Sequence, residues 1–383
     1  MRRTSWTIIA SVLVAFLAVD LAASDWYASP SAPAGQNGRS PATPFRTVQQ
    51  AVNAALPGDT IYLRGGTYRE QVTVTKTATA AAPILITSYA GEQPVLKGSL
   101  IAAGWTQHQG AIWKLSGWAW NSQQVFVDGV AQQQIGMPAG YGTGIASDGT
   151  RMITPVGSGI LDLAPGRFFY DAPSKVLYLW LADGGDPNAH VIEASAYRRI
   201  LFMGSSTFVT VAGVAFRHSS TAAYMVGSAA IELGTDCTLR DCDVQWCDFA
   251  GIALGYQQSR SKVIGCVVSN NGSTGVSVSA TYDFTVSGTT MSTNNYRRFN
   301  PQWHAGGLKA TSKAWGTVER CTVTNNFGSG IWIDYANSGN PIGVRQNWVA
   351  GNTNRGAGIM LEVSKRVTVE NNVVMDNDIR GIY

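Results

Sequence analysis

Three copies of one short segment decide the fold: GGLKATSK (306–313), GIWIDYAN (330–337) and GIMLEVSK (358–365). Each copy opens with glycine, continues with alternating apolar residues and carries a charged side chain. Repeats spaced by roughly two dozen residues are typical of a solenoid, in which each repeat forms one coil and stacks on the next. Equivalent positions of successive copies therefore become neighbours in space.

Aligning the copies on one apolar residue of each predicts a column of charged groups on the outer wall. The residues used for the alignment are Leu308, Ile333 and Leu361. The charged residues that then share a column are Lys309, Asp334 and Glu362. Exposed ion pairs contribute little stability, so folding does not require such a column, and it is the main functional lead.

The composition favours an all-β chain. The 383 residues include 42 Gly, 12 Trp and 14 Tyr, and only 14% are charged, which suits short strands joined by tight turns. The formal net charge is +4, and the sequence has no Lys/Arg-rich run. We therefore expect no nucleic-acid partner.

Residues 1–24 resemble a secretory signal peptide. Arg2 and Arg3 precede an apolar stretch over residues 8–19, and small residues follow at 22–24. The stretch is too short to span ~30 Å of hydrocarbon, and no second apolar run of that length follows. We expect a secreted chain, extracellular or periplasmic, with no membrane contact after cleavage.

An N-terminal cap is predicted before the first strands. Thr43 and Pro44 suit a helix start, apolar residues then recur with helical spacing, and Pro57 with Gly58 ends the helix. The run SPATPFRTVQQAVNAALPGDTIYLRGGTYRE (40–70) resembles the start of secreted right-handed parallel β-helix proteins of the pectate-lyase-like superfamily.

That resemblance implies an all-β right-handed parallel β-helix with three-strand coils and an N-terminal capping helix. We expect the cap and first coils over residues 25–99, an inserted aromatic β-rich segment over 100–205, and regular coils over 206–383. The final coil reads as incomplete, which predicts either a truncated chain or a partner that covers its end. We expect a monomer.

Two turn columns recur in the regular coils. Superfamily β-helices commonly bury an Asn ladder at the first column, where the thiols would be reduced substitutes. That column is Cys242, Cys266, Thr289, Cys321, Asn347 and Asn372. The second column is expected to bend through left-handed backbone, which Asn tolerates. That column is Cys247, Asn271, Asn294, Asn326, Asn352 and Asn377.

By the superfamily register, Lys309, Asp334 and Glu362 stand on the strand that forms the floor of the substrate groove, with Trp332 on the same outer face. The coil before Lys309 is longer than its neighbours, and the excess forms the segment NNYRRFNPQWHA (294–305). This loop is expected to overhang the groove and bring four substrate-binding side chains to it. They are Arg297, Arg298, Trp303 and His304.

The resemblance implies a polysaccharide lyase that acts on an acidic, uronate-containing polysaccharide by β-elimination. Lys309 would be the base, and Asp334 with Glu362 would be further catalytic groups that hold Ca²⁺. Asp334 would also raise the pKa of Lys309 and weaken it as a base. Two alternatives stay open. Asp334 and Glu362 would suit a retaining glycoside hydrolase, and the column would also suit a non-catalytic, glycan-binding surface solenoid.

Overall fold

The computed structural model describes residues 23–136, 156–220, 229–354 and 356–383. Most of the predicted signal peptide, residues 1–22, lies outside this part of the chain. Among the described residues, no helix combines the length and the apolarity needed to cross a membrane.

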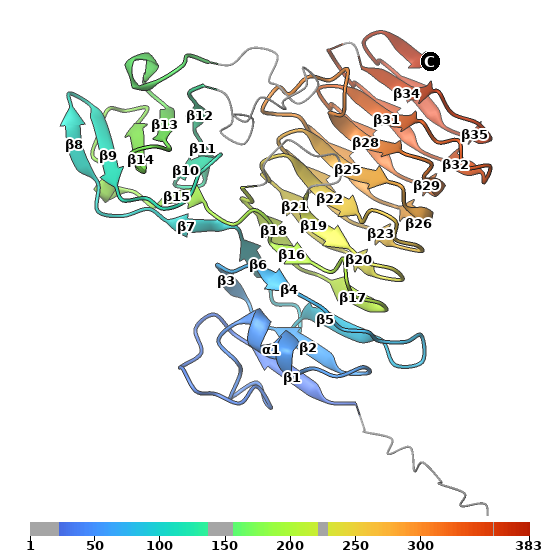
Figure 1. The fold of residues 1–383 in the computed structure, drawn as a ribbon, viewed down its shortest axis with the longest axis horizontal. Helices are drawn as coiled ribbons and strands as arrows, with labels where there is room; N and C mark the ends of the chain where they lie inside the picture. Colours follow the sequence, from blue (N-terminus) through green and yellow to red (C-terminus); the bar gives the residue numbers. More distant parts are fainter. Residues whose placement is uncertain (1–22, 137–155, 221–228, 355) are drawn as a thin grey trace, which may run out of the picture.

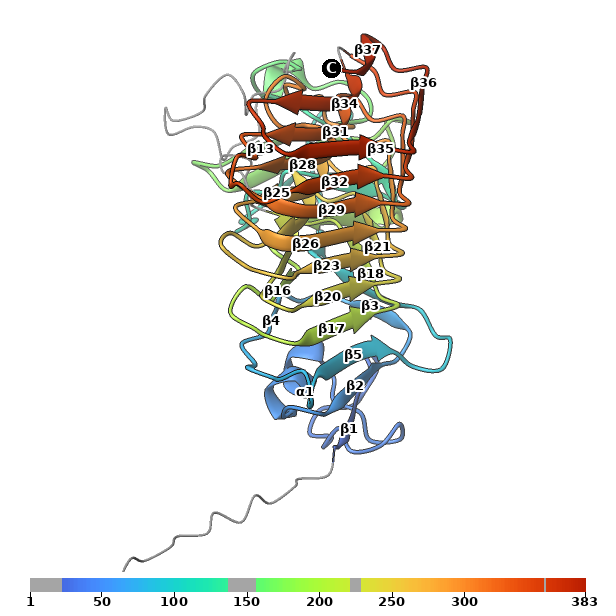
Figure 2. The same cartoon turned by 90° about the vertical axis from the view of Figure 1, so that its right-hand side faces the viewer.

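Three parallel sheets run the length of the molecule, and each coil contributes one strand to each sheet (Figures 1 and 2). The chain is a right-handed parallel β-helix, as the sequence predicts. Sheet 1 contains β1 (Asp25–Ala28), β2 (Thr60–Leu63), β5 (Ile84–Ser88), β17 (Val209–Ala212), β20 (Thr238–Arg240), β23 (Lys262–Ile264), β26 (Tyr282–Ser287), β29 (Trp315–Glu319), β32 (Ile342–Arg345) and β35 (Val367–Glu370).

Sheets 2 and 3 complete the coils. Sheet 2 contains β3 (Gly66–Tyr68), β6 (Pro94–Lys97), β18 (Ala215–Arg217), β21 (Asp243–Gln245), β24 (Val267–Ser269), β27 (Thr290–Ser292), β30 (Thr322–Thr324), β33 (Trp348–Ala350) and β36 (Val373–Met375). Sheet 3 contains β4 (Val72–Thr73), β16 (Leu201–Phe202), β19 (Ala229–Leu233), β22 (Ala250–Leu254), β25 (Thr274–Ser279), β28 (Gly306–Thr311), β31 (Ser329–Asp334), β34 (Ala357–Glu362) and β37 (Arg380–Ile382).

Stacked aliphatic side chains fill the interior of the coils. Strand side chains alternate between the two faces, so the inward positions of successive coils form apolar columns. In sheet 3 one such column is Ile252, Val276, Leu308, Ile331 and Ile359, each at most 1% exposed. The outward positions of the same strands are left for other roles.

Two side-chain ladders close the turns on either side of sheet 2. In the second turn column the amide nitrogen of Asn294 donates to Oδ1 of Asn326 at 3.0 Å, and Asn326 donates in the same way to Asn352 at 2.9 Å. The first column continues the pattern through Asn347 and Asn372. The prediction of left-handed backbone at the second column is wrong by one residue, since Asn325 before Asn326 has φ of 56°.

All five cysteines are free and buried. Three occupy the first turn column and one the second, and burial raises the pKa of Cys321 and of Cys247 to about 11. Lack of exposure makes all five thiols packed side chains, and the raised pKa of Cys321 and Cys247 also makes those two unreactive. The cysteines are therefore part of the architecture.

The N-terminal end is covered by α1 (Val48–Ala54), which buries Val48, Ala51 and Val52. The helix begins four residues later than Thr43 would place it. Its N-cap is Thr47, which forms a capping box with Gln50: each side chain accepts from the other residue's backbone N–H.

Residues 99–195 leave the coils between β6 and β16 and form two small sheets beside them (Figure 1). An antiparallel sheet contains β7 (Ser99–Ile101), β10 (Val125–Val127), β11 (Val130–Ala131) and β15 (Ile192–Ser195). A mixed sheet contains β8 (Thr106–Gln109), β9 (Ile112–Ser116), β12 (Gln133–Gln134), β13 (Arg167–Asp171) and β14 (Val176–Trp180). Short 3₁₀ turns lie at Ile160–Asp162 and Pro187–Ala189.

Most of the aromatic residues of this insertion are structural. They pack with aliphatic residues into a core of their own, which includes Trp105, Trp118, Phe168, Tyr170 and Leu179. This core is separate from the one inside the coils.

Candidate active site on the outer face of sheet 3

The three repeated segments form β28, β31 and β34, which are neighbours in sheet 3. Asp334 pairs with Glu362 in register, as predicted. Lys309 pairs with Trp332, and Trp332 pairs with Met360, so the prediction of one charged column is wrong for Lys309. The error is two residues. Because the strand period is also two, Lys309 keeps the predicted outward face.

Glycine, not leucine, marks the true register. A Cβ added to Gly330 would lie 2.7 Å from the carbonyl oxygen of Gly358 and 2.8 Å from the amide nitrogen of Asn352. Gly307 and Gly358 meet the ladder in the same way. The Asn ladder thus requires a residue without a side chain at this position in each coil.

Lys309 is buried among three partners. Its Nζ lies 2.9 Å from Oδ2 of Asp334 and 3.4 Å from the centre of the Trp332 ring, and it donates to the backbone carbonyl of Trp303. Residue exposure is 6% for Lys309 and 7% for Asp334. The diagonal reach of the long lysine side chain makes this ion pair despite the shifted register.

Burial lowers the pKa of Lys309, although Asp334 and Glu362 oppose the shift. Removing water from an ammonium group penalises its charged form, and here that penalty exceeds the attraction of the two carboxylates. Asp334 does act to raise the pKa of Lys309, as expected, but the expectation of a net rise is wrong because burial has the larger effect. A lysine with a lowered pKa is a better general base near neutral pH.

Two polar atoms beside Lys309 lack a partner. Oδ1 of Asp334 and Nε1 of Trp332 are buried and make no hydrogen bond within the described part of the chain. Leaving a buried donor or acceptor unsatisfied costs about 1–3 kcal/mol, so native structures rarely do it without a reason. One acceptor and one donor are therefore available on the outer face of β31.

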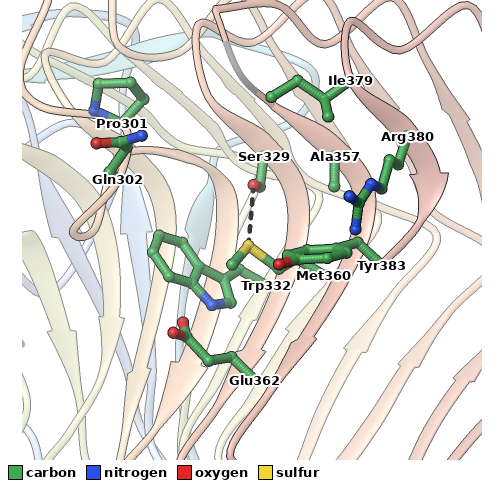
Figure 3. A pocket seen from close by; sticks show the side chains of 10 residues that line it. All are labelled: Pro301, Gln302, Ser329, Trp332, Ala357, Met360, Glu362, Ile379, Arg380 and Tyr383. Atoms are coloured by element: carbon green, nitrogen blue, oxygen red, sulfur yellow. Dashed lines mark hydrogen bonds between the residues drawn. The ribbon is translucent and has the colours of Figure 1, made fainter.

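Next to these atoms lies a pocket of about 400 Å³, here called the Trp332 pocket (Figure 3). In Figure 3, Trp332, Met360 and Tyr383 lie side by side, and the carboxylate of Glu362 is next to the indole. The guanidinium of Arg380 lies 4.1 Å from the ring centre of Tyr383. The lining residues are Pro301, Gln302, Ser329, Trp332, Ala357, Met360, Glu362, Ile379, Arg380 and Tyr383.

The structure divides the predicted catalytic residues. Glu362 lines the Trp332 pocket directly, whereas Lys309 and Asp334 are not among its lining residues. Lys309 contacts the pocket only through the ring of Trp332. A substrate in the pocket therefore meets the indole first.

The sequence reasoning missed Arg380 and Tyr383. Gly381 follows Arg380 and occupies the position of Gly358 one coil earlier, because Ala357 pairs with Arg380 and Ile359 with Ile382. The segment RGIY (380–383) is thus a further copy of the Gly-apolar strand. Alignment on glycine would have placed it beside the other three copies.

The loop over residues 294–305 reaches the pocket with different residues from those predicted. Pro301 and Gln302 line it. Arg297 does not, because it is buried in an ion pair with Asp248. Arg298 lies 3.8 Å over the ring of Phe327. The proposal that two adjacent arginines grip the substrate at this groove is therefore wrong.

Trp303 and His304 are packing residues. Trp303 lies against the apolar cluster of Phe249 and Phe299. His304 is 1% exposed, and its two ring nitrogens contact the hydroxyls of Thr274 and Ser277. Burial, assisted by the charge of Lys309, lowers the pKa of His304 to about 3, so its imidazole is neutral.

The carboxylates near Lys309 do not fit a Ca²⁺ site. Calcium takes 6–8 oxygen ligands, whereas the residues here supply two carboxylates, and Asp334 is already paired with the ammonium of Lys309. Within the described ranges, no group of three or more His, Cys, Asp or Glu side chains is placed to hold a metal. We derive no catalytic step from a metal.

The sheets and the outer pocket define a class: right-handed parallel β-helix proteins with a site on one outer face. Two family models match the chain. A model for a Pel9A-like right-handed β-helix region matches residues 26–150, and a model for a right-handed β-helix region matches residues 224–383. Together, the two matches support a pectate-lyase-like right-handed β-helix protein.

The curated relatives match only part of the chain. Pectate lyase PEL9 of Emericella nidulans is 37% identical over 100 residues, which is 26% of this chain and 23% of the lyase. The uncharacterized protein YwoF of Bacillus subtilis is 33% identical over 101 residues, which is 25% of this chain and 21% of YwoF. The matched segments thus span less than a quarter of either relative.

Solved structures match over most of the chain at low identity. XylC in complex with xylose has a TM-score of 0.70 and 14% identity, over 92% of this chain and 66% of XylC. A glycoside hydrolase has a TM-score of 0.56 and 13% identity, over 91% of this chain and 96% of the hydrolase. Identities this low establish a shared fold and no more.

Proposed function

We propose that this protein is a carbohydrate-active enzyme that cleaves a uronate-containing polysaccharide by β-elimination on the outer face of β28, β31 and β34. The observation that carries the proposal is Lys309, a desolvated lysine on this face whose pKa is lowered although Asp334 lies 2.9 Å away. A named relative is a pectate lyase, which supports the same reaction class. The predicted signal peptide supports a substrate outside the cytoplasm.

The pocket residues supply the parts that elimination needs. Arg380 is placed to bind the uronate carboxylate with two parallel hydrogen bonds, and Trp332 offers an aromatic surface for a sugar ring. Once Lys309 has released its proton, its amine takes the proton at C5, and Asp334 stabilises the ammonium that forms. The C5 electron pair forms the C4–C5 double bond, and the glycosidic oxygen leaves C4 with a proton from solvent. The indole of Trp332 has to turn aside for C5 to reach Nζ.

The test is product analysis with pectate and alginate. Native protein should release products with the ultraviolet absorbance of an unsaturated uronate. Lys309→Met should lower that rate by at least ~100-fold, the usual contribution of a general base. Lys313→Met is the matched control, because Lys313 is exposed on the turn after β28. Full activity in Lys309→Met would remove Lys309 from the mechanism.

Hydrolysis is the second candidate, and the register of Asp334 with Glu362 favours it. Adjacent strands lie ~4.8 Å apart, which is near the ~5 Å carboxyl separation of retaining glycosidases. Glu362 would act from the wall of the Trp332 pocket, and Asp334 from the neighbouring strand β31. New reducing ends without an unsaturated product, lost in Glu362→Gln, would establish this reaction. Binding without either product would leave a glycan-binding solenoid.

A further inference from the structure

A second pocket lies between the insertion and the coils. Tyr296, Arg297 and Arg298, from the same 294–305 loop that reaches the Trp332 pocket, form one side. The other residues come from the insertion, and five of them are glutamines. They are Gln123, Gln124, Gln132, Gln133, Gln134 and Val156. We call this cavity of about 110 Å³ the glutamine pocket.

Hydrogen bonds hold several walls of the glutamine pocket in place. The Tyr296 hydroxyl donates to Oε1 of Gln124, whose Nε2 donates to the backbone carbonyls of Ser219 and Trp246 at 3.0 Å each. Arg297 donates to Oε1 of Gln134. Polar groups fixed in this way form a preorganised surface, which lowers the entropy cost of binding a ligand.

Two acceptors of the pocket have no partner. Oε1 of Gln123 and Oε1 of Gln132 are buried and make no hydrogen bond among the described residues. Gln123 is 3% exposed, and its Nε2 is held by the backbone and side-chain oxygens of Asn121 at 3.2 and 2.9 Å. Its carbonyl oxygen is thus fixed and unsatisfied, at a cost of about 1–3 kcal/mol that a hydroxyl donor would remove.

Most of the polar groups that line the glutamine pocket are uncharged amides. Arg297 is neutralised by Asp248, and Arg298 lies over Phe327. Amide groups and one phenol supply the remaining polar surface. Uncharged acceptors and donors in close succession match the hydroxyls of a sugar better than a carboxylate, a phosphate or an apolar chain.

The size of the pocket limits the ligand. At ~30 Å³ per water, the cavity of about 110 Å³ has room for three or four waters. The hydroxyl-bearing edge of one sugar ring replaces about that number of waters. The Trp332 pocket, at about 400 Å³, is several times larger.

We propose that the glutamine pocket binds a single neutral sugar residue, at a site separate from the Trp332 pocket. The two pockets lie along one loop, since Arg298 lines the first and Pro301 the second. A neutral side branch of a polymer held in the Trp332 pocket is therefore the natural occupant. Binding of a free sugar does not depend on the reaction proposed above.

The test is calorimetric titration of the whole protein with galactose, arabinose, xylose and glucose, with galacturonate as the charged comparison. We expect a neutral sugar to bind with a Kd on the order of 1 mM, and substitutions in the glutamine pocket to leave galacturonate binding, which Arg380 of the Trp332 pocket favours, unchanged. Gln123→Leu and Gln132→Leu should each weaken the neutral sugar at least ~10-fold.

The controls separate this site from the Trp332 pocket. Gln107 is an exposed glutamine on β8, at the opposite edge of the mixed sheet from β12, which carries Gln133 and Gln134. Gln107→Leu should therefore bind the sugar like the native protein. Lys309→Met should also keep sugar binding, even where it abolishes cleavage. Circular dichroism checks that each variant folds. Failure of every neutral sugar to bind, native affinity for the neutral sugar in both glutamine variants, or loss of galacturonate binding in those variants would overturn the proposal.

Discussion

Two buried charged clusters of this protein use similar residue types but differ in how fully their polar atoms are hydrogen-bonded. At the junction of the insertion with the coils, Glu193 accepts from Lys97 and Arg69 through Oε1 and from Ser99 through Oε2. His218 contacts the same Oε2 at 2.9 Å. On β31, by contrast, Asp334 has one ion pair and one oxygen without a partner.

The difference separates architecture from a site. The partners of Glu193 hold its pKa well below the usual range against the effect of burial, and Phe126 covers the ring of His218. A network satisfied to this degree fixes one geometry and leaves little for a ligand. The cluster of Lys309, Asp334 and Trp332 keeps a free acceptor and a free donor beside a pocket. Buried polar atoms without a hydrogen-bond partner, more than charge itself, mark the candidate site.

Breaking the junction cluster should have the largest effect on stability. Glu193→Gln keeps the shape of the side chain and removes its charge, which leaves the cations of Arg69 and Lys97 without a counter-charge. We expect the free energy of unfolding to fall by about 3 kcal/mol, as for other broken buried pairs. Urea unfolding followed by circular dichroism measures the change.

The control for this variant is Glu92→Gln. Glu92 pairs with Arg64 at 2.8 Å, with about a third of each side chain exposed. A pair so open to solvent contributes little to stability. If Glu193→Gln and Glu92→Gln lower the free energy of unfolding equally, the complete hydrogen bonding of the junction cluster contributes no more stability than an exposed ion pair. Cleavage per folded molecule should be native in both variants.

Acid should weaken both regions by a smaller amount. Burial lowers the pKa of His218 to about 4 and of His304 to about 3, from 6.5. The unfolded chain therefore takes up protons below pH 6.5 that the folded chain refuses, so stability is full above that pH and falls as the pH drops. Between pH 6.5 and pH 5 we expect a loss of about 2 kcal/mol for each histidine.

Denaturation midpoints at the two pH values measure this loss. His304→Asn and His218→Asn should each remove about half of the acid sensitivity, whatever they do to stability at neutral pH. An unchanged slope in both variants would mean that neither imidazole is kept neutral by burial.

The fold was predictable because its signals are local and repeated. The 40–70 run resembles the N-terminal cap of a known family, the Gly-apolar segments recur along the chain, and a period of two fixes the face of each strand. The strand register was not predictable, because two apolar residues of the next coil, two positions apart, can each be aligned with Leu308. Gly307 and Gly330 resolve it, but only the Asn326 ladder explains why glycine is needed there.

The site residues were less predictable because their partners are distant in sequence. Arg297 looked available, yet Asp248 neutralises it from two coils earlier. The pKa of Lys309 depended on a balance between burial and attraction, and the sequence shows only the charges. The glutamines at 123–134 carried no signal at all, since their role requires the insertion to face the 294–305 loop.

The smallest effect on stability is expected when the charges of Lys309 and Asp334 are removed together. Lys309→Met alone leaves the buried carboxylate of Asp334 unpaired and should cost about 3 kcal/mol. Lys309→Met with Asp334→Leu replaces the pair by apolar side chains of similar volume, which is often neutral for stability. We expect the double variant to unfold within about 1 kcal/mol of the native protein while lacking activity. Urea midpoints and the product assay measure the two properties independently.

This double variant decides whether the comparison of the two clusters holds. If the Lys309–Asp334 pair exists for chemistry, the fold does not need it, because the ladder of Asn326 and Asn352 and the apolar column inside sheet 3 hold the coils. A loss as large as that of Glu193→Gln would instead make the pair a second structural cluster. The buried ammonium of Lys309 would then have a structural role. Glu362, which lines the Trp332 pocket, would be the stronger catalytic candidate.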